Sequence, residues 1–199
     1  MKKKVSLLLV ILLTMTGCTA VRIDTKDIDN IVDVVLSKEN KLYNHIGKGY
    51  KYYIPRGMTY IDTNEFNDKI YSDGKYYYLY IDAVSYYHQK EVKYEKNQKS
   101  IYFKEIKDDD KKGYIDIIEQ DGKYLVEFMY NYARIESLVN KEDINDVILN
   151  SSYILSTVKF NNNVIKILLD EDYFKYKEEK FELFEKTEEK NENFLEYTE

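Results

Sequence analysis

Apolar residues recur at helical spacing near the start and near the end of the chain. The first stripe has the 3, 4, 7 and 8 spacing of one helical face and consists of Ile28, Ile31, Val32, Val35 and Leu36. It predicts a helix over residues 26–37, capped by Asp24 or Thr25. The second stripe, which begins at Ile144 and ends at Val158, predicts a helix over residues 141–158 capped by Asn140. A short final strand is expected at 164–169.

Between these stripes the hydrophobic pattern changes to short runs of Tyr, Ile, Val and Phe bounded by Gly, Asp and Asn, which is typical of strands. The expected strands cover residues 50–54, 65–72, 75–87, 100–107, 113–119 and 123–130, with a possible additional strand at 58–62. Two turns are explicit, because Asp73-Gly74 and Asp121-Gly122 each separate two apolar runs. Asp-Gly tolerates the positive φ angles of a type I′ turn, so both sites predict hairpins.

This order of elements predicts an α+β fold, in which an antiparallel sheet of six to seven strands carries an N-terminal helix and a C-terminal helix packed on it. We expect one domain over residues 25–169. The segment from Gly49 to Met58, with its proline at position 55, and the later segment from Ile154 to Phe160 resemble PsbP-like domains. That resemblance implies a first strand ending in a proline-containing turn and a last long helix that closes the sheet.

The first eighteen residues have the pattern of an export signal. Lys2, Lys3 and Lys4 precede an apolar run from position 5 to 13, which is about half the roughly 20 residues that a membrane-spanning helix needs. The sequence Met-Thr-Gly-Cys at 15–18 resembles the lipobox of bacterial lipoproteins, although Met15 stands where Leu is usual. The resemblance implies cleavage of a signal peptide at 1–17 and lipidation of Cys18, including palmitate-type acyl chains.

On this interpretation, residues 18–24 form a lipidated tether, and the protein is anchored on the extracytoplasmic face of the cell membrane. Cys18 is the single cysteine of the chain, so no disulfide can form within it. The alternative is an unmodified cysteine that happens to lie near a cleavage site.

Charge restricts the partners. Without residues 1–17 the chain has 27 basic and 36 acidic side chains, a net charge of −9. Such a chain has no electrostatic footprint for nucleic acid or for anionic lipid headgroups, so anchoring must come from the lipid on Cys18. The segment 170–199 has 12 acidic residues and 5 lysines. We expect it to be an acidic, partly disordered tail with a possible short helix.

Signatures of catalysis are absent from the sequence. His45 and His88 are the only histidines, and their spacing fits no zinc site. There is no Gly-x-Ser-x-Gly turn and no phosphate-binding glycine loop. The acidic triplet at 108–110 is followed by two lysines and fits a solvated loop better than a calcium site. We therefore expect no metal, no cofactor, no catalytic residues and no enzymatic activity.

The aromatic run at 76–81 is the remaining candidate for function. In a strand, Tyr76, Tyr78 and Tyr80 share one face, while Tyr77, Leu79 and Ile81 share the other and belong in the core. The first set predicts a binding face, unless a helix covers it. The favoured hypothesis is a non-catalytic binding or accessory module for another cell-envelope protein. The alternatives are a carbohydrate- or peptidoglycan-binding module that uses the tyrosines and a carboxylate-dependent hydrolase.

Overall fold

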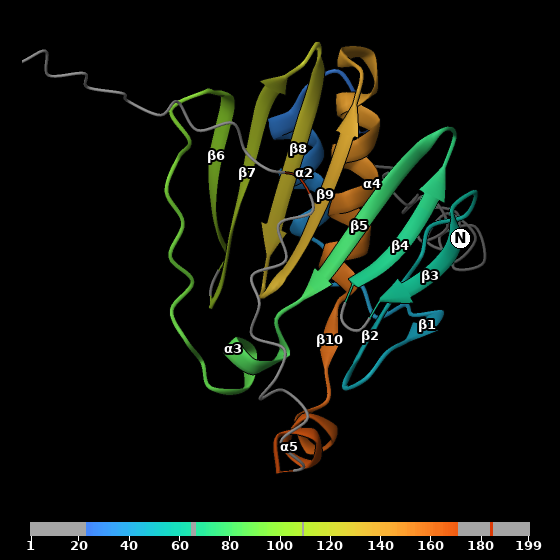
Figure 1. Cartoon of the computed structure of the whole chain (residues 1–199), viewed down its shortest axis with the longest axis vertical. Helices are drawn as coiled ribbons and strands as arrows, with labels where there is room; N and C mark the ends of the chain where they lie inside the picture. The colour runs from blue at the N-terminus through green and yellow to red at the C-terminus, as the bar shows by residue number, and fades with distance from the viewer. Residues whose placement is uncertain (1–22, 65–66, 109, 171–183, 185–199) are drawn as a thin grey trace, which may run out of the picture.

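The computed structural model describes residues 23–64, 67–108, 110–170 and 184 (Figure 1). A seven-stranded antiparallel sheet forms its largest layer. The strands, in their order across the sheet, are β3 (Thr59–Asn64), β4 (Asn67–Ser72), β5 (Lys75–Ile81), β9 (Ala133–Val139), β8 (Lys123–Tyr130), β7 (Lys111–Gln120) and β6 (Ser100–Asp108). The predicted α+β class is confirmed.

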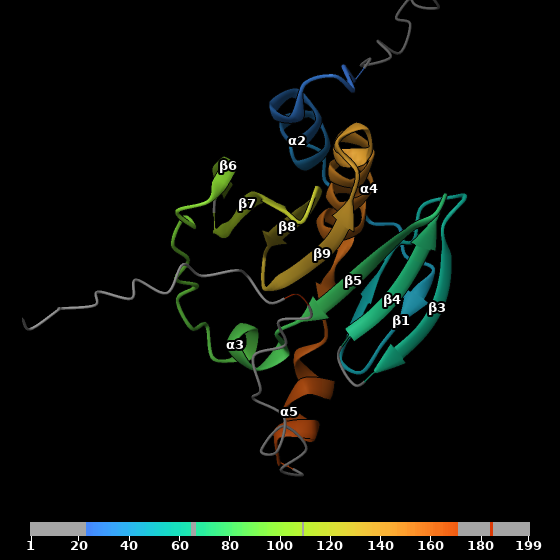
Figure 2. The ribbon, with the colours of Figure 1, turned by 45° about the horizontal axis from the view of Figure 1, so that its top comes forward.

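Helices α2 (Ile28–Leu36) and α4 (Ile144–Thr157) lie on the same side of this sheet (Figures 1 and 2). Helix α4 packs against β8 and β9, and α2 packs against α4. A second, three-stranded sheet consists of β1 (His45–Ile46), β2 (Tyr50–Tyr52) and β10 (Lys159–Phe160), with β2 in the middle. The short elements are α3 (Ala83–Tyr87), η1 (Lys141–Asp143) and α5 (Asn162–Asp170).

The hydrophobic core lies between the helices and the large sheet. Ile31 and Val32 of α2 and Ile148 of α4 are at most 1% exposed, as are the sheet residues Leu79 and Phe128. The first predicted helix is therefore confirmed, although Asp27 caps it and not Asp24 or Thr25. The Asp27 carboxylate accepts a hydrogen bond of 2.9 Å from the Asp29 amide.

Both predicted hairpin turns are confirmed. Asp73 and Gly74 have φ angles of 47° and 80°, and Asp121 and Gly122 have 52° and 75°. These are the two positive values that a type I′ turn requires. A third turn of this kind joins β8 to β9 through Asn131 (φ 49°) and Tyr132 (φ 62°). Neither this turn nor β9 was predicted from the sequence.

Three predictions about secondary structure are wrong. The strand expected at 75–87 ends at Ile81, because the Asp82 carboxylate accepts a hydrogen bond of 2.8 Å from the Ser85 amide and starts helix α3. The segment expected to be a final strand at 164–169 is helical and belongs to α5. Asn140 makes no capping side-chain hydrogen bond, since the 3-10 turn η1 precedes α4.

Two predictions about the termini fall outside the described residues. Cys18 and the expected tether up to residue 22 lie before Ile23, and of the expected acidic tail at 170–199 only Asp170 and Phe184 are described. Among the described helices, none has the length and hydropathy needed to cross a membrane.

Candidate functional site

The predicted tyrosine face lies on the side of the large sheet opposite α2 and α4, which we call the outer face. Tyr77 and Leu79 are fully buried on the helix side, where the Asn150 amide of α4 donates a 3.0 Å hydrogen bond to the Tyr77 hydroxyl. Burial raises the pKa of Tyr77 to about 12. Because strand residues alternate, Tyr76, Tyr78 and Tyr80 project from the outer face. The predicted division of the two sets is confirmed.

Only one end of the tyrosine face is open to solvent. Tyr76 is 43% exposed, and Tyr71 of the neighbouring strand, whose ring centroid lies 5.2 Å away, is 36% exposed. The Lys69 ammonium lies 4.3 Å from the centre of the Tyr76 ring. Tyr78 is half-buried and contacts Phe184 edge to face, with 5.7 Å between the ring centroids.

Tyr80 is half-buried, and its ring lies 5.6 Å from the guanidinium of Arg134. Of the three predicted tyrosines, Tyr76 is therefore the one that is exposed enough to contact a partner. The exposed surface formed by Lys69, Tyr71 and Tyr76 is called the aromatic edge below.

A row of buried acids crosses the outer face beside the tyrosines. Asp116 of β7, Glu127 of β8 and Glu136 of β9 are direct register partners and are 2%, 1% and 4% exposed. Arg134 forms an ion pair of 3.3 Å with Glu136. The Tyr114 hydroxyl donates to Glu127 Oε1. This acid row was not predicted from the sequence, although Asp116 and Glu127 each lie between two apolar residues of their strands.

The three acids lie directly opposite one another on neighbouring strands, and like charges in such positions destabilise a sheet. Burial by itself lowers the pKa of Arg134, but the negative charges of Glu136 and Glu127 have the opposite and larger effect, so the pKa is raised overall. Burial, followed by the charge of Glu127, raises the pKa of Tyr114 above its usual range. Within the described part of the chain, no group of acids, histidines and cysteines is arranged to hold a metal ion. The acid row is thus a buried polar cluster in which Arg134 interacts with Glu136 and Glu127.

A second polar network lies between the two sheets. The buried Asp68 carboxylate accepts hydrogen bonds from the hydroxyls of Tyr52 at 2.8 Å and Tyr50 at 3.1 Å, and His45 Nε2 lies 3.6 Å away. Burial, and then Asp68, raise the pKa of Tyr52 well above its usual range. The His45 ring also stacks on Tyr60 at 4.4 Å. This network fixes the small sheet to β4.

The other histidine does not join this network. His88 follows α3 and contacts the Tyr87 ring edge to face at 5.4 Å.

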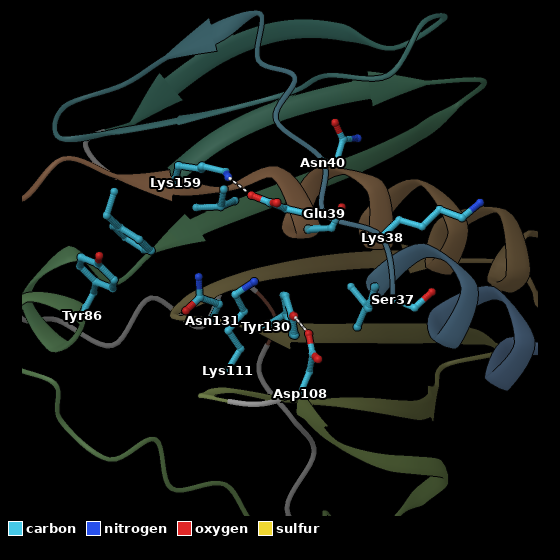
Figure 3. A pocket seen from close by; sticks show the side chains of 14 residues that line it. Ser37, Lys38, Glu39, Asn40, Tyr86, Asp108, Lys111, Tyr130, Asn131 and Lys159 are labelled. Atoms are coloured by element: carbon cyan, nitrogen blue, oxygen red, sulfur yellow. Dashed lines mark hydrogen bonds and ion pairs between the residues drawn. The ribbon is translucent and has the colours of Figure 1, made fainter.

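A pocket of about 510 Å³ lies beyond the C-terminal end of α2 (Figure 3). We call it the lysine pocket after its lining residues Lys38, Lys111 and Lys159, which belong to the loop after α2, the start of β7 and β10. The ammonium group of Lys38 is directed away from the pocket (Figure 3). Its other lining residues are Leu36, Ser37, Glu39, Asn40, Tyr86, Asp108, Tyr130, Asn131, Ser156, Val158 and Phe160.

Three of the charged residues in the lysine pocket already have partners. Lys159 lies 3.6 Å from Glu39, and the Tyr130 hydroxyl donates to Asp108 at 2.6 Å (Figure 3). Asp108, expected in a solvated loop, is therefore part of the pocket wall. The rings of Tyr86 and Phe160 stack at 3.8 Å and form an apolar side of the pocket.

No protein family, curated protein or solved structure matches this chain.

Proposed function

We propose that this chain is a lipoprotein anchored on the extracytoplasmic face of the cell membrane, where it is a non-catalytic binding or accessory module for another cell-envelope protein. The aromatic edge is the surface that we assign to the partner. The anchor is the lipid on Cys18, inferred from the export signal and lipobox at the start of the chain. Two acyl chains hold a protein stably to a bilayer.

The single observation that carries the binding role is the exposure of Tyr71 and Tyr76 side by side on the outer face. Exposed, neighbouring tyrosines are enriched at protein interfaces, because each ring supplies a large contact area with little loss of conformational entropy. Lys69 adds a positive charge beside the rings. A partner with apolar and acidic side chains would complement this surface.

The geometry of the rings favours a protein over a sugar. The planes of Tyr71 and Tyr76 are inclined by 54°, and those of Tyr76 and Tyr78 by 34°. One flat saccharide cannot stack on rings so inclined, and Lys69 already lies over the face of Tyr76. A carbohydrate- or peptidoglycan-binding module is therefore the second candidate. A carboxylate-dependent hydrolase is less supported, since the carboxylates of the acid row are at most 4% exposed.

Site-specific photocrosslinking in intact cells tests the binding role. A photoreactive phenylalanine derivative is placed at Tyr76 and, as a matched control, at Tyr43, which is 50% exposed but belongs to another surface. We expect one dominant adduct with an envelope protein from position 76 and none from position 43. Failure to form an adduct at 76, or the same adduct at both positions, would refute the assignment.

Sedimentation with purified cell wall separates the second candidate from the first. A protein-binding module should stay in the supernatant, whereas a peptidoglycan binder should sediment and lose this property in Tyr76→Ala. Sedimentation that depends on Tyr76 would replace the proposed partner with a saccharide.

A further inference from the structure

We propose that a site between the two sheets binds a ferric ion. The site consists of His45, Tyr50, Tyr52 and Asp68 and is called the inter-sheet site below. No metal was expected from the sequence, because its two histidines fit no zinc spacing and tyrosine ligands follow no such spacing rule. The inference depends neither on the partner of the aromatic edge nor on the lipid anchor.

Strand alternation and register bring the four side chains together. Tyr50 and Tyr52 are two residues apart in β2, so both project from the same face of the small sheet. His45 is the register partner of Tyr52 on the neighbouring strand β1. Asp68 belongs to β4 of the large sheet and accepts hydrogen bonds from both tyrosines. Three side chains of one sheet therefore meet one carboxylate of the other.

The donor atoms of the inter-sheet site converge on a single oxygen atom. Asp68 Oδ2 lies 2.8 Å from the Tyr52 hydroxyl, 3.1 Å from the Tyr50 hydroxyl and 3.6 Å from His45 Nε2. Around a small ion with metal–oxygen bonds of about 2.0 to 2.2 Å, ligands at right angles to one another lie about 2.8 to 3.1 Å apart. The distances from Asp68 to the two hydroxyls already match this spacing, so only the imidazole must move closer.

The charges of these donors select a trivalent ion. When the ion binds, each of the two phenols loses its proton to water, so Tyr50, Tyr52 and Asp68 together carry three negative charges. Three negative charges balance one ferric ion, whereas a divalent ion would leave one charge uncompensated. Balance is required here, because all three residues are at most 4% exposed and an unpaired charge is costly in a buried site.

The donor types also favour iron over zinc. Carboxylate and tyrosinate oxygens are hard ligands, and tyrosine is one of the residues that hold iron in haem proteins. Structural zinc sites are instead built mainly from cysteine and histidine. The inter-sheet site has a single histidine, His45, and the sole cysteine of the chain is at position 18.

The surrounding fold holds the ligands in place before an ion binds. A Cβ atom at Gly47 would overlap the ring and the hydroxyl of Tyr50, so the glycine leaves the space that this phenol occupies. The His45 ring stacks on Tyr60, with 4.4 Å between the ring centroids. Burial, followed by the charge of Asp68, raises the pKa of Tyr52, so its proton stays in the hydrogen bond until a cation replaces it.

The inter-sheet site can be reached from solvent. The His45 side chain is 20% exposed, and it lies on β1, an edge strand of the small sheet. Gly47 and Tyr50 also line a pocket of about 500 Å³. An ion can therefore enter beside the turn between β1 and β2 without opening the hydrophobic core.

The test titrates the purified full chain, kept in detergent, with Fe³⁺ supplied as its nitrilotriacetate complex. Tyrosinate bound to ferric iron gives a charge-transfer band in visible light, which a hydrogen-bonded tyrosine does not produce. Tyr50→Phe and Tyr52→Phe each remove one hydroxyl, and His45→Phe removes the imidazole but keeps a ring to stack on Tyr60. Tyr43→Phe is the matched control, because Tyr43 is 50% exposed and its ring contacts Lys51.

We expect one ion per chain and a visible band that is weakened or shifted in Tyr50→Phe and Tyr52→Phe. The affinity for Fe³⁺ should fall at least about tenfold in each test variant, since even residues that only hydrogen-bond to a metal ligand contribute about 10–100-fold. Tyr43→Phe should bind like the wild type. His45→Phe changes a partly exposed side chain, so it remains a test if a variant that lacks a buried hydroxyl does not fold.

Four results would overturn the proposal. They are no binding of Fe³⁺, binding without a visible band, the same band and affinity in all variants, and tighter binding of Zn²⁺ than of Fe³⁺.

Discussion

Replacing Arg134 by methionine should destabilise the domain strongly at neutral pH. The substitution keeps most of the side-chain volume but removes the cation that lies 3.3 Å from Glu136 and also interacts with Glu127, both of which are at most 4% exposed. Removing one partner of a buried ion pair costs about 3–5 kcal/mol. For a domain of this size, a loss of about 4 kcal/mol lowers Tm by roughly 8–16 °C.

The loss should depend on pH in a defined direction. In Arg134→Met the carboxyl groups of Glu127 and Glu136 lose a nearby cation, and burial and mutual repulsion then favour their protonated form. A group whose pKa is raised by folding stabilises the folded state below the unfolded pKa, and this contribution is lost as pH rises through the folded pKa. The free energy of unfolding of the variant should therefore be closest to that of the wild type near pH 4 to 5, because ordinary carboxyl pKa values are about 4. The difference between the two should be largest above pH 7.

Urea unfolding at acidic and neutral pH measures this difference. Arg56→Met is the matched control, because Arg56 is exposed and should change stability by less than about 0.5 kcal/mol. Adding Glu136→Gln to Arg134→Met should restore part of the stability at neutral pH, since one buried charge is removed. A loss in Arg134→Met that is the same at both pH values, or no loss at all, would refute this account of the acid row.

Two further predictions concern packing. Gly113→Ala should cost about 3 kcal/mol in urea unfolding, because its Cβ would overlap the Met129 carbonyl oxygen and lie 3.0 Å from the Tyr130 Cα. Gly122→Ala, which faces open space at a φ of 75°, should cost only about 1 kcal/mol, and equal losses would contradict the crowding at Gly113. Deleting residues 187–199 should change stability by less than about 0.5 kcal/mol. By contrast, Phe184→Ala should cost about 1 kcal/mol through its contact with Tyr78, and a larger loss from the deletion than from Phe184→Ala would contradict the expected tail.

Local chemistry made part of this fold predictable. The Asp-Gly pairs specify positive φ at two adjacent residues, so both hairpins followed from two residues each. Alternation along the strand predicted that Tyr77 and Leu79 are buried and that Tyr76 and Tyr78 lie on the opposite face, because only one face of this strand packs against the helices. The apolar residues from Ile28 to Leu36 predicted α2, because their helical spacing places them on one face that packs against the core.

The errors arose where several structures fit the same local pattern. The apolar run 164–169 is too short for its periodicity to separate helix from strand, and Asn161 accepts a hydrogen bond from the Val164 amide and starts α5. Strand β9 alternates correctly, but the preceding turn has Asn131 and Tyr132 in place of glycine, so no hairpin was expected. Without β9, the register that aligns the acid row could not be inferred.

The functional surfaces were only partly accessible to sequence reasoning. The tyrosine face followed from alternation, but its partial closure depends on Phe184, more than 100 residues further along the chain. The lysine pocket is lined by residues that include positions 38, 111 and 159, which share no motif. Such a cluster exists only once the strands and helices are placed in space.

Metabolic labelling with palmitate tests the central claim, membrane anchoring through Cys18, most directly. Cells producing the full chain should incorporate the label into this protein, and Cys18→Ser should abolish incorporation and leave the precursor uncleaved. A wild-type protein without label, or a labelled Cys18→Ser protein, would contradict the anchor.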